Sequence, residues 1–404
     1  MSAPTGSDVV TEPASRPDGR PPSPRCAPAP PAARPAAPAH LAPVDVVRVL
    51  TVALVIAVHT VAQQPGGVRL AGGALLTVMH VSREVFFLLT AFVLGYSHRD
   101  RAPSRWWKFW RRRYLLVGVP YLVWSAVYFL ADGEPLRPAG RALAGFAHDL
   151  LTGAARYHLY FLLVSMQMYL VFPVLRRVLA ATRRQHGWLL AGAAVYQFGV
   201  YAAVQQASAL GPLPGWLRDP GPYLPSYLGF VVAGGVAAWH AEEFLRVTGD
   251  RTPWILAGCG AVVAAGVAVF FVRACWLGQA PVAASAVFQP VVVAESVGIA
   301  WALLALGLAW QRRRAFGRRL VRSASDASFG VYLAHPLLLQ GLLAASAATG
   351  LATAAGRLPD PVVTAVAVTV VVPLTYLICW LGVAAGRRTP LSLALTGRPR
   401  RGVP

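Results

Sequence analysis

The chain has 404 residues, of which 56% are hydrophobic and only 13% are charged. This composition is too apolar for a soluble protein, and several apolar runs approach the roughly 20 residues with which a helix crosses a bilayer. The net charge of +21 is compatible with nucleic-acid binding, so the positions of the basic residues must decide what it means. The four cysteines form no CxxC pair and no metal-ligand spacing, which argues against a disulfide framework and a metal site.

The two ends of the chain differ in composition from the rest. Residues 1–43 are dominated by Pro, Ala, Ser and Arg, which predicts a disordered tail. The apolar run begins only near Val44 and is long enough to span, so it is expected to be a signal-anchor helix and not a cleaved signal peptide. Residues 387–404 are expected to form a second tail, short and basic.

Between the tails, residues 44–386 are predicted to form one transmembrane domain. Ten apolar segments alternate with polar loops, so the predicted fold class is an all-α, polytopic integral membrane protein of about ten transmembrane helices. The expected spans are 44–63, 75–97, 114–131, 158–179, 187–205, 223–240, 254–275, 288–310, 328–346 and 361–386.

The basic residues are distributed unevenly across this topology. Most of the 37 Lys and Arg residues fall in the two tails and in the loops on the same side of the membrane as the tails. By the positive-inside rule both termini are then cytoplasmic, and a multi-pass protein of the cell (plasma) membrane is expected. The same distribution explains most of the net charge, so the lipid bilayer is the expected partner and nucleic acid is not.

The first span carries a polar stripe. A helix turns about 100° per residue, which places Arg48 and His59 within roughly 20° of one another and Asp45 and Gln63 within about 60° of Arg48. Arg48 and His59 are then about 16 Å apart along the axis. Ionisable groups inside a membrane are usually functional. The alternatives are interfacial roles for Asp45 and Arg48 and a neutral, helix-packing role for His59.

Three more ionisable residues are expected at the depth of His59. Arg83 and Glu84 in the second span and Glu295 in the eighth should lie with it in a layer roughly 8–12 Å below the outer surface. There they would bind substrate or take part in catalysis, with Glu295 orienting His59 or pairing with Arg83. A purely structural ion-pair network would give the same pattern.

Further polar residues lie near helix ends and at a proline. His158 opens the fourth span, Gln167 follows within it, and both are candidate substrate-binding residues. His335 precedes Pro336 and is expected nearer the cytoplasmic side, where it either binds substrate or bonds the carbonyl that the proline frees.

The loop after the second span has the sequence Arg105-Trp-Trp-Lys-Phe-Trp-Arg-Arg-Arg113. Basic residues and tryptophans at this place are typical of topology and headgroup anchoring. Arg111, Arg112 and Arg113 would equally suit the phosphates of a donor such as an acyl-CoA.

Five segments together resemble the membrane acyltransferase-3 family, whose members O-acylate bacterial surface sugars and secondary metabolites. The likeness covers most of residues 44–345. The segments are Asp45-x-x-Arg48 followed by His59, Ser82-Arg-Glu-Val-Phe-Phe-Leu-Leu-Thr-Ala-Phe-Val-Leu94, Phe109-Trp-Arg-Arg-Arg-Tyr114 with Pro120-Tyr-Leu-Val-Trp124, Tyr157-His-Leu-Tyr-Phe161 with Gln167-Met-Tyr-Leu-Val-Phe-Pro173, and Ser328-Phe-Gly-Val-Tyr-Leu-Ala-His-Pro336.

The resemblance implies ten core helices, an acyl-CoA donor from the cytoplasm and an acceptor on the far side. It implies that Arg48 and His59 are the functional arginine and histidine of the first helix, and that 111–113 is the basic loop. The chain departs from the family pattern at Leu116, where many members have arginine, and at Thr90-Ala91, where a Ser-Gly pair is common.

The resulting hypothesis is an O-acyltransferase that uses no metal. His59 would act as general base or accept the acyl group itself, and Arg48 would hold the donor. The acceptor would be a hydroxyl of a surface glycan, a glycolipid or a secondary metabolite. A proton-coupled exporter of polysaccharide or small molecules is the main alternative, although the two halves show no convincing internal repeat. A scaffold without chemistry would leave His59 and the charges near it unexplained.

Overall fold

The computed structural model describes residues 40–98, 106–133, 138–207, 211 and 214–400. Most of the predicted N-terminal tail therefore lies outside the described residues. The described part consists of helices and their connections, with no β-strand in it, which confirms the predicted all-α class.

The helices differ in length along the chain, with no repeating pattern. Their bounds are α1 Ala42–Ala62, α2 Leu70–Met79, α3 Ser82–His98, α4 Trp106–Ala131, α5 Ala139–Thr152, α6 Tyr160–Ala181, α7 His186–Gln205, α8 Gly215–Arg218, η2 Leu224–Tyr227, α9 Leu228–Trp239, α10 Ala241–Asp250, α11 Thr252–Phe271, η3 Val272–Trp276, α12 Pro281–Ala284, α13 Pro290–Arg312, α14 Arg318–Ala348, α15 Leu351–Gly356, α16 Asp360–Val366, η4 Ala367–Val371, α17 Val372–Gly386 and α18 Ser392–Thr396.

All ten predicted spans correspond to helices. Within the described residues, nine helices or stacked helix pairs are long and apolar enough to cross a membrane. The sixth predicted span, 223–240, is the shorter apolar helix Leu224–Trp239. Its length is about 24 Å at 1.5 Å per residue, somewhat less than the hydrocarbon thickness. The protein is thus a multi-pass membrane protein.

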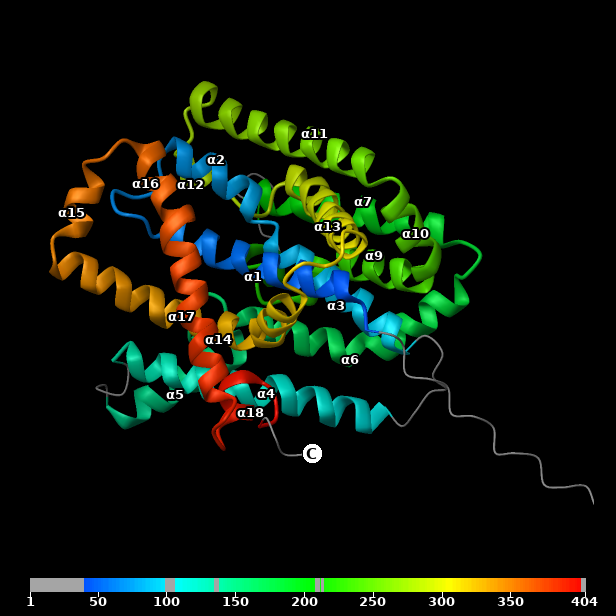
Figure 1. Ribbon diagram of the computed structural model, residues 1–404, viewed down its shortest axis with the longest axis horizontal. Helices are drawn as coiled ribbons and strands as arrows, with labels where there is room; N and C mark the ends of the chain where they lie inside the picture. The colour runs from blue at the N-terminus through cyan, green and yellow to red at the C-terminus, as the bar shows by residue number, and fades with distance from the viewer. Residues whose placement is uncertain (1–39, 99–105, 134–137, 208–210, 212–213, 401–404) are drawn as a thin grey trace, which may run out of the picture. The chain divides into compact units, whose positions relative to one another are not determined.

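α1 occupies the middle of the bundle. It packs against α2, α3, α13, α14 and α17, and in Figure 1 it crosses the centre of the view while α11 runs along an outer edge. This explains why a polar stripe is tolerated on α1. The stripe faces other helices and the spaces between them, and not lipid, where an ionisable side chain would be most costly.

α3 and α9 make the closest helix contact near the site. A Cβ atom at Gly234 would clash with the Leu88 carbonyl oxygen, and one at Gly95 would come within 2.7 Å of the Ala238 methyl group. Small residues at such crossings allow membrane helices to approach closely and gain van der Waals contact. The glycines therefore fix how far α3, which carries Arg83 and Phe86, stands from α9.

The segment after α17 is not only a connection to the C-terminus. It forms the short helix α18, which packs against α4, α14 and α17. The Trp124 indole Nε1–H of α4 donates a hydrogen bond to the Leu395 carbonyl of α18, at 3.2 Å.

Candidate active site

His59 lies in the last turn of α1 and faces a cavity of about 250 Å³, called here the histidine cavity. The imidazole is partly accessible from this cavity and forms no hydrogen bond within the described residues. Its ring lies 4.3 Å from that of Tyr157 and 5.5 Å from that of His335, centroid to centroid. The two rings hold His59 in place and leave its nitrogens available to a bound molecule.

His335 lies behind His59 and is fully buried. Pro336 has no N–H group, so the Tyr332 carbonyl one turn earlier has no helical donor. His335 Nδ1 fills that role at 2.7 Å from the Tyr332 oxygen. A carbonyl only accepts, so Nδ1 carries the proton and Nε2 of the neutral ring is an acceptor. Nε2 is buried and has no partner within the described residues. The bond to the freed backbone is therefore present. The sequence predicts different depths for His335 and His59, whereas the two rings lie side by side, because α14 passes next to the end of α1.

His158 completes a group of three histidines. It is buried in the turn before α6, and its ring centroid lies 5.4 Å from that of His335. Its carbonyl oxygen accepts a hydrogen bond of 2.5 Å from the Tyr332 hydroxyl, which ties the turn to α14. Neither ring nitrogen has a partner within the described residues. The His335 ring stacks on that of His59 and meets that of His158 edge to face. No set of His, Cys, Asp and Glu side chains among the described residues is arranged to hold a metal ion.

Arg83 and Glu84 form a buried ion pair at the wall of the histidine cavity. Arg83 Nη2 lies 2.6 Å from Glu84 Oε1, and Nη1 donates to the Tyr160 hydroxyl at 3.0 Å. The Tyr201 hydroxyl donates to the same carboxylate at 2.7 Å. The guanidinium also lies over the rings of Tyr227 and Phe288, at 5.0 and 4.4 Å from their centroids. Glu84 thus pairs with its neighbour in the chain and keeps Arg83 at the cavity.

Two further polar residues line this cavity and were not predicted as site residues from the sequence. His80 lines it, and its Nδ1 lies 2.8 Å from the Ser285 carbonyl, so Nδ1 again bears the proton. Tyr157 accepts a hydrogen bond from Gln63 at 3.2 Å, and burial raises the pKa of its phenol, which therefore stays protonated at neutral pH. An ionisable residue within an apolar run was the signal for His59, and the same signal was available for His80.

Arg48 lies near the other end of α1 and lines a different cavity from His59. It lines a space of about 210 Å³, called here the arginine cavity, together with Arg113 and Arg398. Arg48 forms no hydrogen bond or ion pair within the described residues. Five residues with hydroxyl groups also line this cavity. The hydroxyls of Thr90, Ser165 and Ser325 already donate to protein oxygens, whereas Tyr169 and Ser328 donate to none among the described residues. The cavity thus offers guanidinium groups and two hydroxyl groups, which bind phosphate and carboxylate oxygens.

The three consecutive arginines of α4 point in different directions. Arg113 enters the arginine cavity, where its guanidinium lies 5.7 Å from the ring centroids of both Phe109 and Tyr169. Arg111 and Arg112 are exposed on the outside of the helix. The run can therefore contribute one cation to the cavity and two to its surroundings.

Asp45 contacts a residue that lines the arginine cavity. Its carboxylate accepts hydrogen bonds from the Ser325 hydroxyl at 2.8 Å and from His40 at 2.7 Å. It is buried and does not line the cavity. Asp45 therefore fixes the Ser325 side chain and supplies negative charge near Arg48.

Phe86 and Phe161 are common to both cavities. Their rings meet edge to face with centroids 5.2 Å apart, and the Tyr332 ring lies 5.4 Å from that of Phe161. The two cavities thus meet at a pair of aromatic side chains, with arginines on one side and histidines on the other.

Comparison with known proteins decides the family. Residues 42–383 match the acyltransferase-3 family model, which is described as an acyltransferase domain. The chain belongs to this acyltransferase family. The expected resemblance and the expected enzyme class, an acyltransferase, are thereby confirmed. A stretch of 103 residues is also 36% identical to Acyltransferase MdmB of Streptomyces mycarofaciens, covering 24% of this chain and 26% of that protein. No solved structure matches the chain.

Two residues predicted for the site of this acyltransferase lie elsewhere. Glu295 is fully buried on α13 and lines neither cavity, and its carboxylate packs against Gly266 of α11 without a hydrogen-bond partner in the described chain. The expected pairing with Arg83 or His59 is absent, because Glu295 faces a different side of α13. Gln167 bonds the Pro222 carbonyl and the Leu224 N–H, at 2.7 and 2.9 Å, and so fixes the loop before η2.

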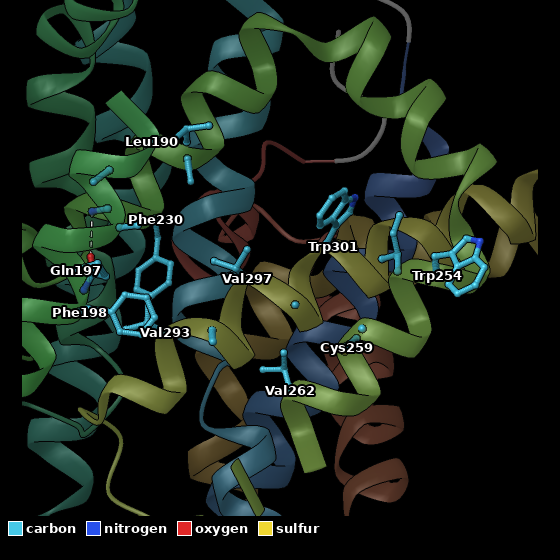
Figure 2. Close-up of a pocket in the computed structure, with 18 of the residues that line it drawn as sticks. Leu190, Gln197, Phe198, Phe230, Trp254, Cys259, Val262, Val293, Val297 and Trp301 are labelled. Atoms are coloured by element: carbon cyan, nitrogen blue, oxygen red, sulfur yellow. Dashed lines mark hydrogen bonds between the residues drawn. The ribbon is translucent and has the colours of Figure 1, made fainter. Parts of the chain in front are cut away.

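A further cavity, of about 730 Å³, differs from the arginine and histidine cavities in its lining. It lies between α7, α9, α11 and α13, and Figure 2 shows it walled by side chains such as Phe198, Phe230, Val293 and Val297. The Gln197 side chain in its wall donates a hydrogen bond to the Ser226 carbonyl and accepts one from the Gly229 N–H. Arg251 and Cys259 also line it, but no histidine and no carboxylate does, so this cleft offers no side chain of the usual general-base types.

Proposed function

We propose that this protein is an integral membrane O-acyltransferase that moves an acetyl or similar acyl group from a cytoplasmic acyl-CoA to a hydroxyl of a surface glycan, a glycolipid or a secondary metabolite. The observation that carries the proposal is the pair of cavities that meet at Phe86 and Phe161, one with unpaired Arg48 and the other with His59. A phosphate-bearing thioester needs a cationic site and a basic site at a distance from it. The family assignment favours this interpretation over a carrier.

The arginine cavity would bind the polar part of the donor. Arg48 and Arg113 supply guanidinium groups whose planar donors match phosphate oxygens. A volume of about 210 Å³ is too small for a whole nucleotide and its arm, so the nucleotide would lie at the cytoplasmic mouth, near exposed Arg111 and Arg112. The arginine cavity would then lie on the cytoplasmic side, as the positive-inside rule predicts for the ends of helices that are rich in Lys and Arg.

The pantetheine arm would then run along α1 toward His59. Arg48 and His59 are separated by about 16 Å of helix, a span that a long, flexible arm can cover. The thioester would pass between Phe86 and Phe161 and enter the histidine cavity, where the acceptor binds from the outer side of the plasma membrane. Tyr157, Tyr160 and His80 line this cavity and offer hydrogen bonds to a polar acceptor.

His59 would transfer the proton, and two routes fit its position. In the first, the acceptor hydroxyl attacks the thioester carbonyl carbon while His59 takes the hydroxyl proton; the C–S bond breaks, and the proton passes to the departing thiolate. In the second, an imidazole nitrogen of His59 attacks the thioester carbonyl carbon, and the C–S bond breaks to release the thiolate. The acceptor hydroxyl then attacks the acyl-imidazole, the C–N bond breaks, and the hydroxyl proton passes through the imidazole to the thiolate. In both, His335 and His158 position the His59 ring and exclude water behind it.

The experiment is to incubate membranes that contain the protein with acetyl-CoA labelled in the acetyl group. Label should appear in extracted glycan, lipid or metabolite with wild type and fall at least a hundredfold with His59→Ala, because general acid–base catalysis contributes about 10²–10⁴-fold. Absence of label on protein that is denatured rapidly near neutral pH would favour the first route, because an acyl-imidazole would be lost in acid. Label on wild-type protein that is lost in the variant would favour the second.

His148→Ala provides the matched control. His148 is an exposed histidine of α5 outside both cavities, and its substitution should leave transfer intact. Full transfer by His59→Ala at normal protein level would refute the role of His59. If neither acetyl-CoA nor longer acyl-CoAs donate label, while wild-type cells export a polymer and cells with the His59→Ala variant still export it, the transporter interpretation is favoured instead.

A further inference from the structure

The C-terminal segment of the chain reaches the arginine cavity. The connection after α17 leads into α18, which ends at Gly397 with a φ of 65°. A Cβ atom at Gly397 would clash with the Phe329 ring and come within 2.9 Å of the Leu116 carbonyl, so the chain is closely fitted there. The Ser392 hydroxyl donates to the Arg398 carbonyl at 2.8 Å and closes the turn. This segment follows the last residue that the family match covers.

Two residues of the segment, Gly397 and Arg398, line the arginine cavity beside Arg48 and Arg113. Arg398 therefore brings a third guanidinium to a space of about 210 Å³. Like charges that line one small cavity repel one another, and together they attract an anion. The sequence alone placed this arginine in a basic tail, where it would have served topology only.

The carboxylates near the cavity do not balance these cations. Asp326 pairs with Arg398 at 2.9 Å, and both side chains are partly exposed. Asp45 is already engaged by Ser325 and His40. An anion that enters the cavity can therefore replace Asp326 as the partner of Arg398 at little cost, because an exposed ion pair is weak.

We propose that Arg398 is a donor-binding residue that exchanges Asp326 for a phosphate group of the acyl-CoA, so that the C-terminal segment completes the donor site. The inference rests on the proposed function and extends it to residues after the transmembrane domain. It also gives the donor site a lid that is covalently attached to α17 and tied to α4 by the Trp124 bond.

The test measures the dissociation constant of coenzyme A for purified protein in detergent, without added phospholipid. Arg398→Gln should raise Kd about tenfold, the loss expected for a charge-assisted hydrogen bond. Arg398→Lys should recover part of the affinity. Asp326→Asn should lower Kd a few-fold, because it removes the carboxylate that competes with the donor phosphate.

Arg400→Gln is the matched control for lost charge. Arg400 is exposed, donates to the Arg388 carbonyl and lines neither cavity. The Kd of the Arg400→Gln variant for coenzyme A should therefore equal that of wild type. Thermal unfolding of each variant reports whether the fold is retained.

The outcomes separate the inference from the function on which it rests. If wild type binds no coenzyme A, the proposed donor is wrong. If wild type binds and Arg398→Gln binds equally well, the inference is wrong. If Asp326→Asn weakens binding as much as Arg398→Gln, the ion pair only fastens the segment and the inference is again wrong. Loss of bound phosphatidylglycerol in Arg398→Gln, with Kd for coenzyme A unchanged, would identify a lipid headgroup as the ligand instead.

Discussion

The rings of Phe86 and Phe161 lie 5.2 Å apart at the boundary between the arginine cavity and the histidine cavity. Phe86 belongs to α3 and Phe161 to the first turn of α6, so the boundary depends on the packing of two helices that are distant in sequence. On the proposed route, a donor arm that runs from Arg48 to His59 passes between these side chains. The width of this passage should therefore control which acyl groups reach the histidines.

Narrowing the passage is expected to slow transfer without weakening donor binding. Phe86→Trp adds bulk at a partly buried position and should lower the acetyl transfer rate about tenfold, equivalent to about 1.4 kcal/mol of barrier. The coenzyme A affinity should stay within twofold of wild type. Phe146→Trp, at a partly buried phenylalanine that packs on Phe129 away from both cavities, is the control. Equal transfer rates for Phe86→Trp and the control would exclude this passage.

The Pro336 position is expected to act on catalysis through His335. Pro336→Ala restores a backbone N–H that competes with His335 Nδ1 for the Tyr332 carbonyl. Loss of one hydrogen bond to the ring should slow transfer roughly threefold to tenfold. The thermal unfolding temperature should be unchanged or higher, because the helix gains a bond. A variant that is less stable and equally fast would show that the proline serves the fold alone.

The Arg83–Glu84 pair is expected to matter more for stability than a partly exposed pair. Glu84→Gln leaves the Arg83 guanidinium without its counter-charge in a buried position and should cost about 3 kcal/mol of unfolding free energy. Asp132→Asn, which weakens the more exposed pair with Arg156, should cost about 1 kcal/mol or less. Thermal unfolding in detergent compares the two variants. Equal losses would contradict the burial argument.

The α3–α9 contact is expected to tolerate no added side chain. Gly234→Ala places a methyl group against the Leu88 carbonyl, which cannot rotate away, and should cost about 1–3 kcal/mol. Gly199→Ala, at an exposed position of α7 with no atom within 4 Å of the new methyl group, should cause no loss. The comparison requires only unfolding temperatures. Similar temperatures for both variants would show that α3 and α9 can separate slightly.

The sequence predicted the helices and the polar face of α1 because both depend on local periodicity. The spacing of Arg48 and His59 along one helix determines their depth and direction, and each indeed lines a cavity. The chemistry of Pro336 is equally local, so the bond from His335 could be anticipated.

Relations between helices could not be predicted in this way. The sequence predicts a similar depth for Glu295 and His59, but depth does not reveal which side of α13 faces the site, and the carboxylate faces α11. Arg83 has its counter-charge in the adjacent residue, Glu84, and not in Glu295. Arg398 lies beyond the last span, and only the folding of α18 onto α4 brings it to Arg48.

We propose that the donor binds at Arg48 and reacts at His59. Both parts can be tested on one preparation of the His59→Gln variant, by measuring the Kd for coenzyme A and the rate of acetyl transfer. We expect a Kd within twofold of wild type and a transfer rate at least a hundredfold lower. Transfer at the wild-type rate, or a loss of transfer fully explained by weaker coenzyme A binding, would contradict the proposal.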